Sequence, residues 1–365
     1  MRFIVIGLGS MGTRRIRVLK TLGYDDIVGF DTNVIPEKEY GIPVIQANDI
    51  PNPYYALRRT IEESEKGTIQ LKGKYDAMIV SVPPLLKQPY INIAADLNIP
   101  CFCEADVITY SGTYCSSATM RFYPAIVKIK ELLDAGTLGK VYTFTYHCGN
   151  SLYDWHPDAD MKTYYAAKKE SGACKEMFAF ELGWLSMLFG RPIEAKGIID
   201  KKLDDPDIKA DDIFATTVKF AKQSKDGNIR IGTVNFGKGT SLFPLVQCDT
   251  ITGTILIDIL SRPAIRELRI VGEKCNLFWN WDYNCMELEY PNGEITMIFY
   301  QKTAAFEGYN KNISEQMYID ELANYINSIQ GKETYIYSSE EEKQVIKMLE
   351  MLENSEKREY NITVG

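Results

Sequence analysis

Three glycines near the start of the chain have the spacing of a dinucleotide-binding turn. Gly7, Gly9 and Gly12 form a G-x-G-x-x-G motif within the stretch MRFIVIGLGSMG. The first glycine permits a tight turn, the second lets a pyrophosphate approach the backbone, and the third lets a helix pack closely on a sheet. We predict that these glycines, with Ser10 and Met11 between the last two, contact a dinucleotide.

The elements that must position this motif follow in the expected order. Residues 3–6 are an unbroken apolar run, typical of a strand buried on both faces. Residues 11–22 can form the helix whose N-terminal amides would face the phosphates. Residues 26–30 predict a second strand that ends in Asp31, and an acid about 20 residues after the glycines suits a ribose diol.

Asp31 also bears on which nicotinamide coenzyme binds. Its carboxylate can accept two hydrogen bonds from the diol and would repel a 2′-phosphate, which favours NAD over NADP. Arg14 and Arg15 are close by in the sequence and could still serve a phosphate, so NADP is kept as the alternative.

Further strands and helices alternate along the first third of the chain. Residues 77–82 and 100–104 predict buried strands, and residues 54–66 and 86–97 predict helices. This alternation indicates a doubly wound parallel sheet of the Rossmann type, whose ligands lie at the carboxyl ends of the strands. The residues that end these two strands are therefore predicted coenzyme contacts: Ser81, Val82, Pro83 and Glu104.

The pattern changes after residue 120. Helices are predicted over residues 124–135 and 175–188, and strand-like runs then follow without long helices between them. The runs are 194–201, 213–220, 229–236, 245–260, 267–271, 286–290 and 295–300. Such a succession indicates an α+β domain with a large, mostly antiparallel open sheet. We predict a nucleotide-binding domain over residues 1–120 and this second domain over residues 121–365.

The end of the chain is helical again. Ser338 followed by Glu341 has the form of a capping box ahead of a last helix. The sequence leaves open whether the final helices pack back on the first domain.

Composition limits the classes of function. The 365 residues carry a formal net charge of -8, which disfavours nucleic acid or an anionic membrane as the main partner. No stretch approaches the ~20 apolar residues of a membrane helix. The chain enters strand structure at once, so we expect no secretory leader and a cytoplasmic location. The scattered cysteines and only two histidines, His147 and His156, predict buried reduced thiols and no metal site.

In this order of motifs the chain resembles the glucose-fructose oxidoreductase, inositol dehydrogenase and rhizopine catabolism family. The glycine motif, the Ser-Val-Pro-Pro strand end and the strand ending in Glu104 carry the resemblance, together with residues 121–139 and 171–190. The resemblance implies a first domain that binds NAD or NADP. It also implies a second domain that supplies half of a pocket for a sugar or polyol, and a sheet through which homodimers or homotetramers form.

The chain departs from that family at two catalytic positions. The family usually carries Glu-Lys-Pro where this chain has Glu104, Ala105 and Asp106. Its later helix opens with Asp-x-x-x-His or Asp-x-x-x-Tyr, where this chain has Glu176 and Phe180. Oxidation of a carbinol needs a group that takes the hydroxyl proton, and such a base is worth ~10² to 10⁴ in rate. Another side chain must therefore replace it.

Three residues are candidates for the missing catalytic groups: Lys175, Glu176 and His156. Lys175 begins the later helix, where the helix dipole and partial burial would favour a neutral amine that the adjacent Glu176 could hold. Solvated first-turn charges are the alternative for this pair, and a packing role is the alternative for His156. Trp155 and Tyr165 lie in the same aromatic segment and are predicted to contact the substrate, Tyr165 also as a phenolic acid or base.

These residues lead to two functional hypotheses. The first is an NAD(P)-dependent oxidoreductase that acts on a hydroxyl or keto carbon of a sugar, sugar acid or nucleotide-linked sugar. The second is a family member that keeps the dinucleotide site but has lost the chemistry, and acts as a dinucleotide-sensing or partner-binding protein. The titratable groups between residues 156 and 176 favour the enzyme.

Overall fold

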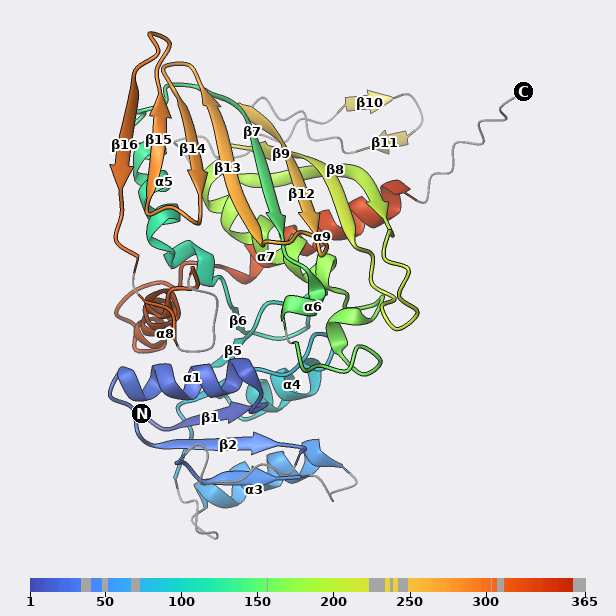
Figure 1. The fold of residues 1–365 in the computed structure, drawn as a ribbon. Helices are drawn as coiled ribbons and strands as arrows, with labels where there is room; N and C mark the ends of the chain where they lie inside the picture. Colours follow the sequence, from blue (N-terminus) through green and yellow to red (C-terminus); the bar gives the residue numbers. More distant parts are fainter. Residues whose placement is uncertain are drawn as a thin grey trace, which may run out of the picture. The chain divides into compact units, whose positions relative to one another are not determined.

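The computed structural model of the chain consists of two compact units (Figure 1). It describes residues 1–33, 41–47, 52–66, 73–155, 157–222, 234–236, 239–241, 249–302, 304–306 and 312–356. The first unit joins Met1–Tyr123 to Thr303–Glu342, and the second joins Pro124–Lys302 to Lys343–Gly365. The domain boundary at residues 120 and 121 stays a prediction.

The first unit is built on a six-stranded sheet in which every pairing is parallel. Its strands are β1 Phe3–Ile6, β2 Ile27–Asp31, β3 Val44–Gln46, β4 Ala77–Val80, β5 Cys101–Cys103 and β6 Cys115–Ser116. They lie in the order β3-β2-β1-β4-β5-β6. The direction in which successive strands are added reverses between β1 and β4, which is where such sheets bind ligands. The predicted doubly wound sheet is confirmed.

Helices follow these strands and cover the sheet. They are α1 Ser10–Thr21, α3 Pro53–Glu65 and α4 Gln88–Asp96, with a 3-10 turn at Thr119–Phe122 and α8 Glu315–Ile329. Figure 1 shows α8, from the C-terminal part of the chain, beside α1, and the two helices are in contact. The first unit therefore takes in a helix from late in the sequence.

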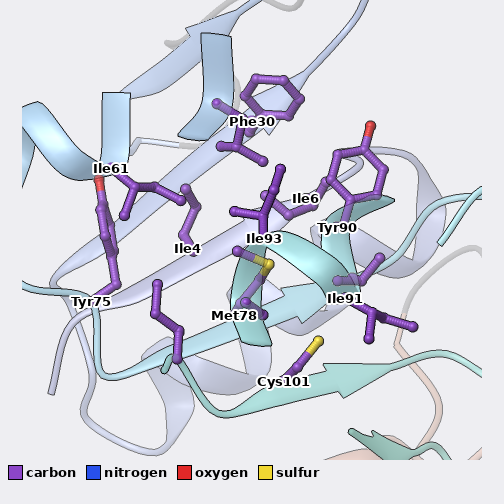
Figure 2. Close-up of a cluster of buried hydrophobic side chains, with 14 of the residues drawn as sticks. Ile4, Ile6, Phe30, Ile61, Tyr75, Met78, Tyr90, Ile91, Ile93 and Cys101 are labelled. Atoms are coloured by element: carbon purple, nitrogen blue, oxygen red, sulfur yellow. The ribbon is translucent and has the colours of Figure 1, made fainter. Parts of the chain in front are cut away.

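The core beneath the strand ends is close-packed (Figure 2). Ile4 and Ile6 of β1, Phe30 of β2 and Met78 of β4 belong to one buried cluster with Tyr90 of α4, and each is at most 5% exposed. The rings of Phe30 and Tyr90 meet edge to face, with centroids 6.3 Å apart. Since burying one such side chain is worth ~1.5–3 kcal/mol, this core holds the carboxyl ends of the strands as a rigid platform.

The second unit is built on an eight-stranded sheet in the order β16-β15-β14-β13-β7-β12-β9-β8. Its strands are β7 Val141–Gly149, β8 Arg191–Asp200, β9 Ile213–Ala221, β12 Thr250–Asp258, β13 Ile265–Gly272, β14 Asn276–Asn280, β15 Cys285–Glu289 and β16 Ile295–Phe299. Only β12 and β7 pair in parallel; the other pairings in this sheet are antiparallel. The predicted mostly antiparallel sheet is confirmed. Two short strands, β10 Val234–Phe236 and β11 Gly239–Ser241, form a separate pair.

Helices lie on one face of this sheet, where α7 Ala173–Phe189 contacts β8, β9 and β12, and α5 Pro124–Asp134 packs on α7. The other helical segments are the short α6 Leu152–Trp155, a 3-10 turn at Tyr165–Ala167, and α9 Ser339–Glu356, most of which belongs to this unit. Along β7, Phe144 and Tyr146 are buried on the helix side, and the Phe144 ring stacks on Phe189 of α7 at 4.1 Å. The alternate residues Thr143 and Thr145 are exposed, as expected for a sheet with one solvated face.

The last helix begins as its sequence predicts. The Ser338 hydroxyl accepts from the Glu341 amide at 3.2 Å, and the Glu341 carboxylate accepts from the Ser338 amide at 3.0 Å. These two bonds form the reciprocal capping box.

Candidate coenzyme site and substrate residues

The glycine turn joins β1 to α1. Two of its glycines have no room for a side chain, and the third has open space beside it. A Cβ atom on Gly7, whose φ is +82°, would lie 2.7 Å from the Ser81 carbonyl oxygen, and one on Gly12 would lie 1.8 Å from the Gly7 carbonyl oxygen. A Cβ on Gly9 would meet nothing within 4 Å. Gly7 and Gly12 are therefore needed for the chain to pack against itself, whereas Gly9 faces open space at the start of α1. That arrangement fits a phosphate close to the helix N-terminus.

Asp31 is held at this turn by two backbone amides. The Leu8 amide donates to Oδ2 and the Asn33 amide to Oδ1, both at 2.7 Å. The side chain is buried at the end of β2 and so has one orientation. Each carboxylate oxygen has a further lone pair, so the group can still accept from a ribose diol. The ribose role of Asp31 stays a prediction, and its geometry fits that role.

Arg14 and Arg15 of α1 are committed to acidic partners. The fully buried Arg15 guanidinium donates to both oxygens of Glu104 at 2.7 and 2.9 Å, and to Glu321 of α8 at 2.8 Å. Arg14 Nε lies 3.4 Å from a carboxylate oxygen of Glu315. The suggestion that these two arginines serve a 2′-phosphate is therefore not supported by their contacts.

Glu104 and Ser81, two predicted coenzyme residues at the ends of β5 and β4, are brought together. The Ser81 hydroxyl donates to the Glu104 carboxylate at 3.2 Å. Burial alone would raise the pKa of Glu104, but the charge and hydrogen bonds of Arg15 hold it below its ordinary value. Glu104 is therefore an ionised, structurally engaged acid at the strand ends. Its contact with a coenzyme stays a prediction.

In the second unit, Lys175 is paired at the start of α7. Its ammonium forms an ion pair with Glu353 of α9, and only 16% of the lysine side chain is exposed. A carboxylate on another helix therefore pairs with Lys175, whereas the sequence offered the adjacent Glu176 as a residue that could hold it.

Glu176 meets a tyrosine pair. Burial raises the pKa of Tyr165 well above its ordinary value, and the charge of Glu176, the neighbouring Tyr164 and a hydrogen bond with Glu176 add to the shift. The rings of Tyr164 and Tyr165 lie edge to face, with centroids 5.1 Å apart. Tyr165 thus keeps its proton at neutral pH and lies beside a carboxylate.

The backbone around Tyr165 is pinned. The Ser171 hydroxyl donates to the Tyr165 carbonyl at 2.7 Å, and the amides of Lys209 and Ala210 donate to the Ala167 carbonyl at 2.7 and 2.9 Å. A Cβ on Gly172, which precedes α7, would lie 2.5 Å from that of Ala210. The tyrosine therefore sits on a rigid support.

The remaining predicted residues of this segment are placed less fully. The Trp155 indole donates to the Asn150 carbonyl at 3.3 Å, and its ring is half-buried. His156 lies outside the described residues. The substrate role of Trp155 and the catalytic role of His156 stay predictions.

The described part of the chain contains neither a candidate membrane span nor a candidate group of metal ligands. No helix there is both long enough and apolar enough to span a membrane. Among the same residues, three or more metal-binding side chains are nowhere grouped as a metal site would require.

Two comparisons with known proteins bear on this fold. Residues 126–241 match the model of the GFO/IDH/MocA C-terminal domain, which confirms the family resemblance seen in the sequence. An oxidoreductase from Agrobacterium radiobacter, in complex with NAD+, L-tartaric acid and magnesium, superposes with a TM-score of 0.70 at 12% identity, over 98% of this chain and 96% of that one. No curated protein sequence matches the chain.

Two further structures share the fold. Levoglucosan dehydrogenase in complex with NADH and levoglucosan has a TM-score of 0.70 at 12% identity, over 98% of this chain and 97% of that one. UDP-N-acetylglucosamine 3-dehydrogenase GnnA from Acidithiobacillus ferrooxidans has a TM-score of 0.65 at 12% identity, over 97% of both chains. At such identities the likeness establishes the fold, and the chemistry must be argued from the residues.

Proposed function

We propose that this chain, a member of the GFO/IDH/MocA family by the match over residues 126–241, is an NAD-dependent oxidoreductase acting on a carbohydrate. In this proposal a hydride passes between the nicotinamide and a hydroxyl or keto carbon of a sugar, sugar acid or nucleotide-linked sugar. The structurally similar dehydrogenases of levoglucosan and of UDP-N-acetylglucosamine support this substrate class.

The glycine turn is the observation that carries the proposal. Gly7 and Gly12 leave no room for side chains because the chain packs against itself, and Gly9 leaves its outer side open. Asp31 is fixed beside the turn by the amide of Leu8. A pyrophosphate at the start of α1 and an adenosine ribose on Asp31 would use both features together.

NAD is preferred to NADP on the charges around Asp31. A carboxylate there repels a 2′-phosphate, and Arg14 and Arg15 already face Glu315, Glu104 and Glu321. We expect NADP to bind more weakly than NAD.

Tyr165 and Glu176 are the residues that we assign to proton transfer. The bound nicotinamide would supply or accept the hydride. When a ketone is reduced, the Tyr165 hydroxyl would give its proton to the carbonyl oxygen as that oxygen becomes a hydroxyl. Solvent would then return a proton to the phenolate, with the Glu176 carboxylate relaying it; the reverse sequence applies to oxidation. Lys175 is the competing assignment, although Glu353 now holds its ammonium.

Coenzyme binding and turnover test the proposal separately. Calorimetric titration with NAD+ and NADP+ is expected to show binding, with NAD+ tighter, and Asp31→Asn should narrow that preference. The protein and NAD+ are then mixed with a panel of sugars, sugar acids and nucleotide-linked sugars while the absorbance of the reduced nicotinamide is followed. Absence of coenzyme binding contradicts the proposal. Binding without turnover on any substrate favours the sensing or partner-binding alternative.

We also propose that the open face of the second unit's sheet joins two copies of this chain. The face has a hollow of about 620 Å³ lined by residues of five strands, among them Thr145, Thr254 and Leu256, and Leu256 is 37% exposed. Exposed apolar residues lie on the edge strand: Ile295, Met297 and Phe299. Light scattering should show a dimer or tetramer that Thr254→Arg dissociates and Thr254→Ser does not. A monomeric wild type would contradict this.

A further inference from the structure

A buried ion pair lies where β4 and β5 end, and neither of its charges has a part in the chemistry above. Lys87, at the start of α4, donates from Nζ to Asp106 Oδ2 at 2.7 Å and to the Ala105 carbonyl at 2.9 Å. The lysine side chain is fully buried and that of Asp106 is 1% exposed. Apolar residues of similar volume often stabilise a protein as well as a buried ion pair does. This pair therefore calls for a reason other than stability.

Asp106 also contacts a residue with an unusual backbone conformation. Leu85 has φ +73°, a left-handed value that disfavours residues with a side chain. Its amide points to the Tyr110 hydroxyl oxygen at 3.1 Å and to Asp106 Oδ2 at 3.3 Å. The Tyr110 hydroxyl in turn donates to Asp106 Oδ2 at 2.5 Å. Backbone strain of this kind persists only where the surroundings impose it, and it gathers at ligand sites.

The strand order places this segment beside one half of a bound dinucleotide. Asp31 ends β2 on one side of β1, the glycine turn follows β1, and β4 lies on the other side of β1. A dinucleotide with its adenosine ribose on Asp31 and its pyrophosphate at Gly9 must extend its nicotinamide half toward the end of β4. The close approach of the Gly7 turn to Ser81, directly after β4, shows that the two strand ends adjoin.

We propose that Lys87 and Asp106 are positioning residues that fix residues 83–86 as an apolar wall for the nicotinamide half of the coenzyme. Leu85 and Leu86 are 36% and 50% exposed, so their side chains are available to contact a ring. The pair sets the backbone from which these side chains project, through the amide of Leu85. This inference rests on the proposed function, because it assumes that the dinucleotide is a nicotinamide coenzyme.

The test compares the whole coenzyme with a fragment that lacks nicotinamide. Calorimetry gives the Kd of NADH and of ADP-ribose for the wild type, Lys87→Met, Tyr110→Phe and Leu86→Ser. We expect each substitution to weaken NADH binding about tenfold and to change ADP-ribose binding less than about twofold, because the adenosine and pyrophosphate contacts are untouched. Tyr110→Phe removes one hydroxyl and keeps both charges, so it gives an answer even where Lys87→Met fails to fold.

Arg58→Met is the matched control, since it breaks a solvent-exposed ion pair with Asp96, between α3 and α4 of the same unit. It should leave both dissociation constants unchanged. Equal weakening of NADH and ADP-ribose in the variants, or no change in either, would overturn the inference and leave the proposed function standing. A wild type that binds neither compound would overturn both.

Discussion

The predicted site residues contact one another in the first unit and have separate partners in the second. In the first, the predicted residues converge: the Gly7 turn packs on Ser81, Ser81 donates to Glu104, and Asp31 is held by Leu8, next to the turn. In the second, the neighbours Lys175 and Glu176 diverge. Lys175 pairs with Glu353 of α9, and Glu176 meets Tyr165.

The difference follows from what fixes each site. A dinucleotide turn is local, because a glycine spacing, one helix and one strand end suffice to build it. A proton-transfer group depends on which side chains from distant segments meet, and sequence spacing does not encode that. Adjacent residues on a helix point about 100° apart, since a turn takes 3.6 residues, so Lys175 and Glu176 need not share a partner.

Tyr165→Phe is expected to have the largest effect, because it removes the proposed proton donor of the second unit. If Tyr165 transfers the proton, kcat should fall by ~10² to 10⁴ while the Kd for NAD+ stays within about twofold. Steady-state kinetics on the best substrate of the panel, with calorimetry for the coenzyme, measure both.

Lys175→Met provides the opposing measurement. It is expected to lower kcat less than Tyr165→Phe does, because its ammonium is engaged by Glu353. A larger fall in kcat for Lys175→Met than for Tyr165→Phe would assign the catalytic role to Lys175. The sequence prediction would then hold in the second unit as well as in the first.

Glu321→Ala should be the most destabilising change in the first unit. Glu321 is fully buried and accepts from Arg15, from the hydroxyls of Ser117 and Thr119, and from the Ala118 amide. Its removal leaves a buried guanidinium one partner short, which costs about 3–5 kcal/mol of unfolding free energy. Urea unfolding measures the change. Glu62→Ala, which breaks an exposed pair with Arg58, is the control and should cost under about 1 kcal/mol.

Two glycine substitutions separate folding from coenzyme binding. Gly12→Ala places a Cβ 1.8 Å from the Gly7 carbonyl oxygen and should destabilise the protein by about 1–3 kcal/mol. Gly9→Ala points its methyl group into open space, so its midpoint of thermal unfolding should match the wild type. NAD+ binding should nevertheless weaken in Gly9→Ala, because the methyl group occupies the approach of the phosphates. Unchanged NAD+ binding there would place the dinucleotide elsewhere.

Most of the fold could be predicted because its signals are local. Buried strands are visible as apolar runs, as in residues 3–6, and Ser338 and Glu341 predict the start of the last helix. β14 Asn276–Asn280 was missed because its mixture of asparagine and aromatic residues lacks a plain alternation. The predicted run at residues 229–236 lies largely outside the described residues, and the run at residues 245–260 is the shorter β12 Thr250–Asp258.

The candidate site was predictable only where backbone geometry defines it. The buried partnerships of Arg15 with Glu321 and of Lys87 with Asp106 join residues 306 and 19 positions apart, and no spacing rule connects them. The available signal for a buried charge was a basic residue that follows apolar residues. Lys87, which comes after two leucines beyond the end of β4, has that form.

The smallest expected effect is a pH dependence within the Arg15 network. The pKa of Glu104 lies below its ordinary value of 4.5, so the stability it contributes is fully present above pH 4.5 and is lost as the pH falls toward its folded-state pKa. Burial raises the pKa of Glu321, so its contribution has the opposite slope and falls as the pH rises above 4.5. Urea unfolding of the wild type and Glu104→Gln, from about pH 6 to about pH 3, separates the two. The stability difference between them should shrink only on the acid side, because the amide that Glu104→Gln introduces cannot titrate there. If the difference in unfolding free energy between the wild type and Glu104→Gln is constant with pH, Arg15 does not hold Glu104 in its ionised form. The ion pair with Arg15 would then not explain why the residues of the first unit converge.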